Sequence, residues 1–191
     1  SKSAESWNRN PKRLRIWCAA ASTGQEPYSL GMILREKQAL LKDWRVEIIG
    51  TDLSSEVLTR AKSGIYSQFE VQRGLPVQLM VKYFAKEREQ WRIKDDSRSM
   101  VEYRQMNLLD SFVGLGNFDI IYCRNVLIYF DEATKRGILE RMAQLWPDDG
   151  YLLLGSAETV VGITTAFSPL QGAQGVSIKR SASAALKANV A

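Results

Sequence analysis

LRIWCAAASTGQEPYSL, at residues 14–30, is the stretch that decides the fold of this chain. Its apolar first half, up to Ala20, is typical of a buried strand, and the small residues that follow predict a tight turn at Gly24. Pro27 stands where a helix would begin, since proline is tolerated in a first helical turn. A strand, a loop of small residues and a helix start are the parts of a nucleotide-type ligand site at the carboxyl edge of a parallel sheet.

The loop lacks the common phosphate-binding motifs. A dinucleotide fingerprint needs three glycines at fixed spacing, and a P-loop ends in Gly-Lys-Ser/Thr, but Gly24 stands alone here. Glu26 also places a negative charge where a phosphate site prefers basic or neutral groups. That charge suits a cationic ligand, of which a sulfonium or an amino-acid ammonium is the obvious type.

The composition of the 191 residues limits the class of protein. A hydrophobic content of 45% and a charged content of 25% are ordinary for a soluble globular protein. No apolar run is long enough to insert into a membrane, and the first residues lack the apolar core of a signal peptide, so we expect a cytoplasmic protein. The net charge of +5 suits an acidic partner, but the basic residues are spread out, and we expect no nucleic-acid partner.

The absence of histidine excludes several chemistries. A Ser-His-Asp or Cys-His hydrolase and a His-containing zinc site all need this residue. Cys18 and Cys123 both lie in apolar runs, and we interpret them as reduced core residues rather than as a disulfide or metal ligands. The sequence therefore predicts no metal site.

Strands and helices alternate along most of the chain, which predicts an α/β fold with a doubly wound, mostly parallel sheet. The patterns predict strands at residues 14–20, 45–51, 118–123, 151–154 and 175–179, and helices at residues 26–41, 54–62 and 132–146. Ser54 and Asp131 are the expected N-caps of the last two helices. We expect one domain over residues 1–180, with a turn at 147–150, and an Ala/Ser-rich tail at 181–191 that is disordered.

Residues 66–105 break this alternation and predict an inserted subdomain of one short helix and a β-hairpin. The helix is expected at residues 75–84. Residues 91–94 and 100–103 alternate apolar and polar side chains, with residues 95–97 as a turn between them. We therefore expect these two stretches to pair as a hairpin in a small antiparallel β-subdomain.

The wording STGQEPYSL resembles the STGEEPYS motif of the chemotaxis receptor glutamate methyltransferases, the CheR type. Further segments agree in the same order, and the resemblance covers roughly residues 13–180: GTDLSSEVLTRAKSGIY (50–66), NLLD (107–110), CRNVLIYFD (123–131) and GYLLLGSAE (150–158). The resemblance implies a Rossmann-like class I fold that uses S-adenosyl-L-methionine (SAM) and releases S-adenosyl-L-homocysteine (SAH). It also implies methyl transfer to glutamate side chains on the cytoplasmic helices of chemoreceptors.

The resemblance assigns functions to individual residues. The implied cofactor-binding residues are Ala20, Glu26, Asp52, Leu53, Asn107, Leu108, Cys123 and Arg124. Asp52 ends a predicted strand, where an acidic residue binds ribose hydroxyls, and Asn107 is suited to an adenine edge. Two alternatives stay open, because Asp52 could cap the next helix and Glu26 could simply favour a helix N-terminus.

Tyr129 and Arg124 are the implied catalytic residues. The Tyr129 hydroxyl could position the substrate carboxylate or contact the methyl group, while the alternative is core packing of the Tyr-Phe pair. Arg124 follows a predicted strand, where a buried guanidinium would need an anionic partner. It is a candidate for holding the substrate carboxylate.

Two features depart from the resembled family. Residues 1–13 contain no T-x-F-F-R-type motif, which predicts either a fragment or a diverged protein. Members that are tethered to a receptor's C-terminal peptide carry a glycine-containing insertion in the small hairpin, and no glycine lies between Leu75 and Val113. We therefore do not expect peptide tethering.

Two other functions remain open at this stage. One is a methyltransferase acting on nucleic acid or an amine, but amino-methylating enzymes often carry a D/N-P-P-Y/F motif, and the corresponding stretch RNVLIY has no proline. A non-catalytic SAM- or SAH-binding module of a signalling protein would keep Glu26, Asp52 and Asn107 but transfer no methyl group.

Overall fold

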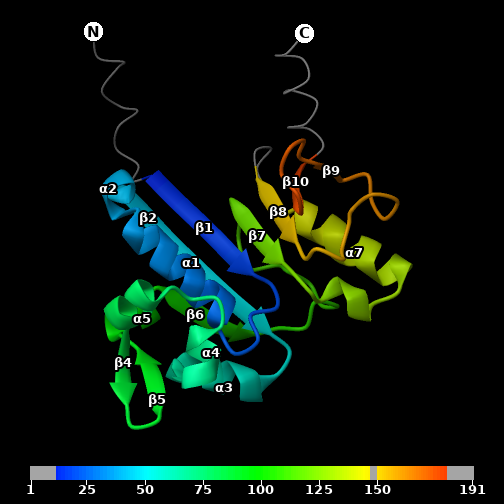
Figure 1. The fold of residues 1–191 in the computed structure, drawn as a ribbon. Helices are drawn as coiled ribbons and strands as arrows, with labels where there is room; N and C mark the ends of the chain where they lie inside the picture. The colour runs from blue at the N-terminus through cyan, green and yellow to red at the C-terminus, as the bar shows by residue number, and fades with distance from the viewer. Residues whose placement is uncertain (1–11, 147–149, 180–191) are drawn as a thin grey trace, which may run out of the picture.

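A seven-stranded sheet forms the centre of the molecule (Figure 1). The computed structural model describes residues 12–146 and 150–179. The strand order is β6-β2-β1-β7-β8-β10-β9. The strands are β1 (Lys12–Cys18), β2 (Trp44–Asp52), β6 (Val101–Gln105), β7 (Ile120–Cys123), β8 (Tyr151–Leu154), β9 (Phe167–Pro169) and β10 (Val176–Lys179).

The sheet is mostly parallel. Strands β6, β2, β1, β7 and β8 run parallel to one another, and only β10 is antiparallel to its neighbours β8 and β9. The chain adds β2 and β6 outward from β1 on one side, then β7 and β8 on the other side, where β9 forms the edge and β10 inserts between β8 and β9. The predicted doubly wound, mostly parallel α/β sheet is therefore confirmed, with its topological switch point between β1 and β7.

Helices cover both faces of the sheet, because alternate residues of each strand point to opposite sides. Ile16 and Cys18 of β1 pack with the cluster around α1 (Gln25–Glu36) and α3 (Ser55–Ser63). Trp17 points the other way, into the cluster that includes Ile138 of α7 (Glu132–Ala143). Figure 1 shows α1 and α7 on opposite faces.

The expected helix starts are confirmed and two helix ends differ. Ser54 Oγ accepts a hydrogen bond from Val57 N at 3.3 Å, and Asp131 Oδ1 accepts one from Thr134 N at 2.8 Å. The helix expected at 26–41 is interrupted at Lys37 and continues as α2 (Gln38–Leu41).

The helix expected at 132–146 ends earlier, at Ala143. Trp146 leaves the helix because its ring packs edge-on against Phe167, and its indole N–H donates to the Asp119 carbonyl.

The predicted pairing of residues 91–94 with 100–103 is wrong. A separate antiparallel sheet has the order β3-β5-β4, formed by β3 (Ile65–Ser67), β4 (Phe84–Glu87) and β5 (Gln90–Ile93). The expected turn is the short helix α6 (Asp95–Arg98), and β6 pairs parallel with β2 at the edge of the main sheet. An edge strand with one buried face alternates in the same way as a hairpin strand, because Val101 and Tyr103 face the core.

The rest of the insertion is helical. The helices are α4 (Gln68–Gln72) and α5 (Val77–Tyr83), the second lying within the helix expected at 75–84.

Strand β9 was not expected. The turn expected at 147–150 falls largely on residues 147–149, which, like the tail, lie outside the described residues, so these expectations stay predictions.

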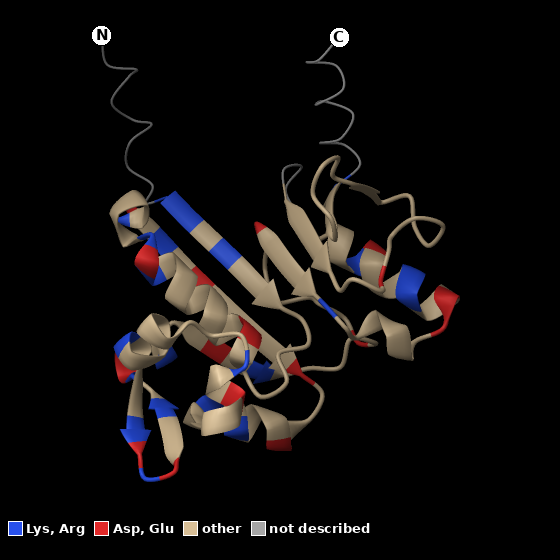
Figure 2. Cartoon of the chain, viewed as in Figure 1, with Lys and Arg blue, Asp and Glu red and all other residues tan. Residues whose placement is uncertain are grey.

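Charge is distributed over the whole molecule. Figure 2 shows Lys, Arg, Asp and Glu interspersed on both sheets and on the helices around them.

Cys18 and Cys123 are buried and free. Among the residues that the structure describes, no helix is long and apolar enough to cross a membrane.

Candidate functional site

A cavity of about 220 Å³ opens at the carboxyl ends of β1, β2, β6 and β7. It lies at the switch point, where ligands of open α/β sheets bind. Its walls are Ala19, Ala20, Asp52, Leu53, Met106, Asn107, Leu108, Val126, Tyr129 and Phe130. The structure thus brings six of the sequence-predicted site residues together: Ala20, Asp52, Leu53, Asn107, Leu108 and Tyr129.

Asp52 joins two loops at the edge of this cavity. Its Oδ2 accepts a hydrogen bond from Ser22 N at 2.9 Å, and its Oδ1 accepts one from Ser54 N at 3.1 Å. The carboxylate therefore fixes the loop after β1 against the start of α3. Each carboxylate oxygen can accept more than one hydrogen bond, so Asp52 can still accept from a ligand hydroxyl.

Asn107 and Leu108 follow β6 and form the opposite wall. Asn107 Oδ1 accepts a hydrogen bond from Leu109 N at 2.9 Å, which leaves the amide NH₂ without a bond to any described residue. The Leu108 side chain is buried, and its carbonyl accepts from Arg141 Nη2 at 2.6 Å. An amide donor beside a fixed apolar side chain suits a flat heteroaromatic ring.

Glu26 and Arg124 form an ion pair across the ends of β1 and β7. Arg124 Nη1 lies 3.2 Å from Glu26 Oε2, so the anionic partner expected for Arg124 is a carboxylate of the protein itself. Burial raises the pKa of Glu26 above its ordinary value of 4.5, while the nearby Arg124 opposes this shift. These two residues do not line the cavity described above.

Tyr129 and Cys123 are placed very differently. Tyr129 ends the 3₁₀ helix η2 (Leu127–Tyr129) and is 79% exposed, which excludes the alternative that it packs in the core. The Cys123 side chain is fully buried, and this burial raises the pKa of its thiol. Any contact of Cys123 with a ligand would therefore run through its backbone.

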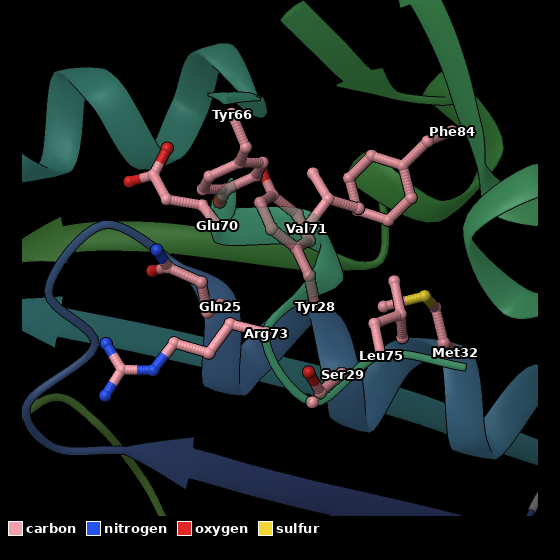
Figure 3. Close-up of a pocket in the computed structure, with 11 residues that line it drawn as sticks. Gln25, Tyr28, Ser29, Met32, Tyr66, Glu70, Val71, Arg73, Leu75 and Phe84 are labelled. Carbon is pink, nitrogen blue, oxygen red and sulfur yellow. The ribbon is translucent and has the colours of Figure 1, made fainter. Parts of the chain in front are cut away.

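A hydrogen bond from the small sheet stabilises the loop between β1 and α1. Tyr66 of β3 donates a hydrogen bond to the Thr23 carbonyl at 2.6 Å. Gly24 has φ +94°, and a Cβ at this position would lie only 2.6 Å from Tyr103 Oη, so glycine is required for both reasons. Figure 3 shows Tyr66 beside Tyr28 of α1, in the wall of a second cavity between α1 and the inserted segment.

Sequence reasoning missed part of the cavity wall, namely Ala19, Met106, Val126 and Phe130. Ala19, Met106 and Phe130 directly adjoin residues that were singled out, and Val126 lies two residues after Arg124. Their apolar character alone gave no signal of ligand contact. No group of three or more potential metal ligands occurs within residues 12–146 and 150–179.

Comparison with known proteins gives the family. Residues 2–176 match the family model described as CheR methyltransferase, SAM binding domain. The chain belongs to this family. The resemblance seen in the sequence motifs is thus confirmed.

Curated relatives of this CheR domain are chemotaxis methyltransferases. It is 44% identical over 169 residues to chemotaxis protein methyltransferase 1 of Pseudomonas aeruginosa, covering 86% of this chain and 62% of that protein. It is 41% identical over 173 residues to chemotaxis protein methyltransferase Cher2 of Pseudomonas putida, covering 88% of this chain and 63% of that protein. The chain therefore spans less than two thirds of the length of these relatives.

The groups around the cavity fit SAM, the ligand in the family's description. The Asp52 carboxylate is an acceptor for hydroxyls, and the free Asn107 amide is a donor for a ring nitrogen. The Glu26 carboxylate, in the first turn of α1, provides negative charge for a sulfonium or ammonium group. The acceptor, the donor and the negative charge of this CheR domain thus match the ribose, the base and the cationic tail of such a molecule.

Proposed function

We propose that this protein transfers a methyl group from SAM to glutamate side chains on the cytoplasmic helices of chemoreceptors, forming methyl esters. The observation that carries the proposal is the cavity at the switch point, with Asp52 and Asn107 on its walls and an exposed tyrosine at its edge. The names of the curated relatives support the same reaction. The proposal implies a bacterial protein of the cytoplasm.

In this proposal the adenosine part of SAM occupies the cavity. Asp52 accepts from the ribose hydroxyls and Asn107 donates to the adenine edge, while Leu53 and Leu108 pack against the rings. Ala20 leaves room for close approach of the loop backbone. Glu26 faces the cationic amino-acid end, together with the backbone near Cys123 and Arg124.

The chemistry needs no general base, which agrees with a chain that lacks histidine. When bound, SAM supplies an activated methyl group, and S-adenosylhomocysteine leaves with the electron pair of the broken carbon–sulfur bond. A glutamate carboxylate has an ordinary pKa well below 7 and is therefore already ionised at neutral pH. The protein then contributes by holding the reacting groups in line.

Tyr129 and Arg124 are the residues proposed at the reacting end. The Tyr129 hydroxyl is exposed beside the cavity and can donate to the incoming carboxylate. Arg124 is partly exposed and bound to Glu26, so it can hold a second carboxylate only with the part of its guanidinium that this pair leaves free. We therefore assign the larger share of substrate positioning to Tyr129.

Recognition of the receptor does not involve a tethering peptide in this proposal. The connection between β4 and β5 is short, and no glycine-containing insertion is present between Leu75 and Val113. The receptor helix itself is then the substrate surface.

The test is a methyl-transfer assay with radiolabelled SAM and a cytoplasmic fragment of a chemoreceptor. We expect label that mild alkali releases as volatile methanol, as a carboxyl methyl ester requires. Alkali-stable label would indicate methylated nitrogen and contradict the proposal. Because the chain spans only part of its relatives, the assay includes this chain fused to the upstream region of the Pseudomonas aeruginosa protein. SAH binding without transfer in either form would instead favour the non-catalytic module.

A further inference from the structure

The carboxylate of Glu158, outside the cavity, accepts hydrogen bonds from the backbone of the loop that carries Tyr129. Glu158 Oε1 accepts hydrogen bonds from Asn125 N at 2.6 Å and Gly155 N at 2.8 Å. Its Oε2 accepts from Val126 N at 3.1 Å and Leu127 N at 2.8 Å. Three successive N–H groups after β7, and one after β8, thus point at a single side chain.

The loop is shaped to surround an anion. Asn125 has φ +58°, the left-handed conformation that asparagine tolerates better than most residues. Such a turn directs consecutive N–H groups to one side and makes a concave site for negative charge. Without the carboxylate, these donors would have no partner among the described residues, and for the partly buried N–H groups of Val126 and Leu127 this loss is costly.

Gly155 permits this close approach of the two loops. A Cβ on Gly155 would lie 2.4 Å from Asn125 Oδ1 and 2.7 Å from Glu158 Oε1. No larger residue fits without moving one of the two groups. In the GSAE stretch after β8, Gly155 therefore leaves space for the close approach and Glu158 supplies the carboxylate.

We propose that Glu158 is a positioning residue for the methyl-transfer end of the cofactor site. The loop that it fixes contributes Val126, Tyr129 and Phe130 to the cavity wall. Leu127, whose N–H it binds, is buried and anchors η2 to the core. Glu158 itself does not line the cavity, so it acts on a bound ligand only through this loop. This inference rests on the proposed function, since it takes SAM or SAH as the ligand.

The first test compares SAH affinity in two matched variants. Glu158→Gln keeps the size of the side chain but turns one acceptor oxygen into a donor that faces backbone N–H groups. We expect its Kd for SAH to rise by about tenfold or more, as for the loss of one well-formed charged hydrogen bond. Glu140→Gln, on the exposed face of α7, makes the same chemical change without these contacts and is expected to leave the Kd unchanged.

The second test separates positioning from general stability. Glu158→Ala leaves the N–H groups facing a small gap, into which formate can bring a carboxylate. We expect sodium formate, but not sodium chloride at equal ionic strength, to restore much of the SAH affinity of this variant. Val160→Ala, a truncation of a buried core residue in the same segment, should show no such response.

The outcomes distinguish the two proposals. Wild-type affinity for SAH in Glu158→Gln would overturn the inference, and so would weakened binding in Glu158→Ala that chloride and formate affect equally. Failure of the wild-type chain to bind SAH would overturn the proposed cofactor site, and the inference with it.

Discussion

At the residue scale, Glu26 gives the site a pH dependence. Burial raises its pKa above the ordinary value of 4.5, so the protonated form persists to a higher pH than in an exposed glutamate. Only the ionised form attracts the ammonium group of SAH. We therefore predict that SAH affinity falls as the pH is lowered through this raised pKa, and that it is highest when Glu26 is fully ionised.

Calorimetric titrations with SAH from neutral to mildly acidic pH measure this effect. Glu26→Gln is the matched variant, since it has no titrating group and should bind weakly with a flat profile over this range. A wild-type profile as flat as that of Glu26→Gln would contradict the role given to Glu26.

Tyr129 allows a separation of catalysis from binding. Because its side chain is 79% exposed, Tyr129→Phe should leave the melting temperature unchanged. We predict that methyl transfer slows by about tenfold, corresponding to one hydrogen bond made to the reacting carboxylate, while the Kd for SAH stays the same. Rates under saturating SAM and calorimetry with SAH give the two values, and equal losses in both would contradict a catalytic role.

At the element scale, the cofactor loop depends on the inserted small sheet. Residue 27 is proline and has no N–H, so the Thr23 carbonyl receives its hydrogen bond from Tyr66 of β3 instead. We predict that Tyr66→Phe lowers SAH affinity by about threefold to tenfold, since the loss of one hydrogen bond loosens the loop.

Tyr103→Phe is the matched control for Tyr66→Phe. Its buried hydroxyl lies beside the Tyr28 hydroxyl without a well-formed hydrogen bond, so its removal should change both the stability and the SAH affinity little. Thermal unfolding and calorimetry on both variants check this. Identical effects of the two substitutions would show that ring packing, not the Tyr66 hydrogen bond, supports the loop.

The elements also show which features a sequence can reveal. Caps such as Ser54 and Asp131 were predicted because their bonds span only three residues. Strand β6 was assigned to the wrong sheet, since its pairing with β2 bridges residues about fifty apart in the sequence. The same limit hid Tyr66 and Glu158, whose partners are 43 and up to 33 residues away.

At the scale of the whole molecule, both sheets share one core cluster. Ile93 and Phe84 of the small sheet pack in the same cluster as Met32 of α1 and Ile48 of β2. We predict a single unfolding transition. Ile93→Ala, which truncates a fully buried side chain, should lower the free energy of unfolding by about 2–5 kcal/mol. Denaturant unfolding followed by circular dichroism and by tryptophan fluorescence should give coincident curves. Two separated transitions would show that the small sheet unfolds independently.

The central claim is that the cavity beside Asp52 binds SAH, and calorimetric titration of SAH into this chain and into Asp52→Asn tests it most directly. The Asp43→Asn variant, changed at an exposed residue before β2, is the matched control. We predict micromolar binding by the wild type and by Asp43→Asn, and a Kd raised by about tenfold or more in Asp52→Asn, which loses a charged acceptor. No binding by the wild type at millimolar SAH, or equal binding by all three, would contradict the account.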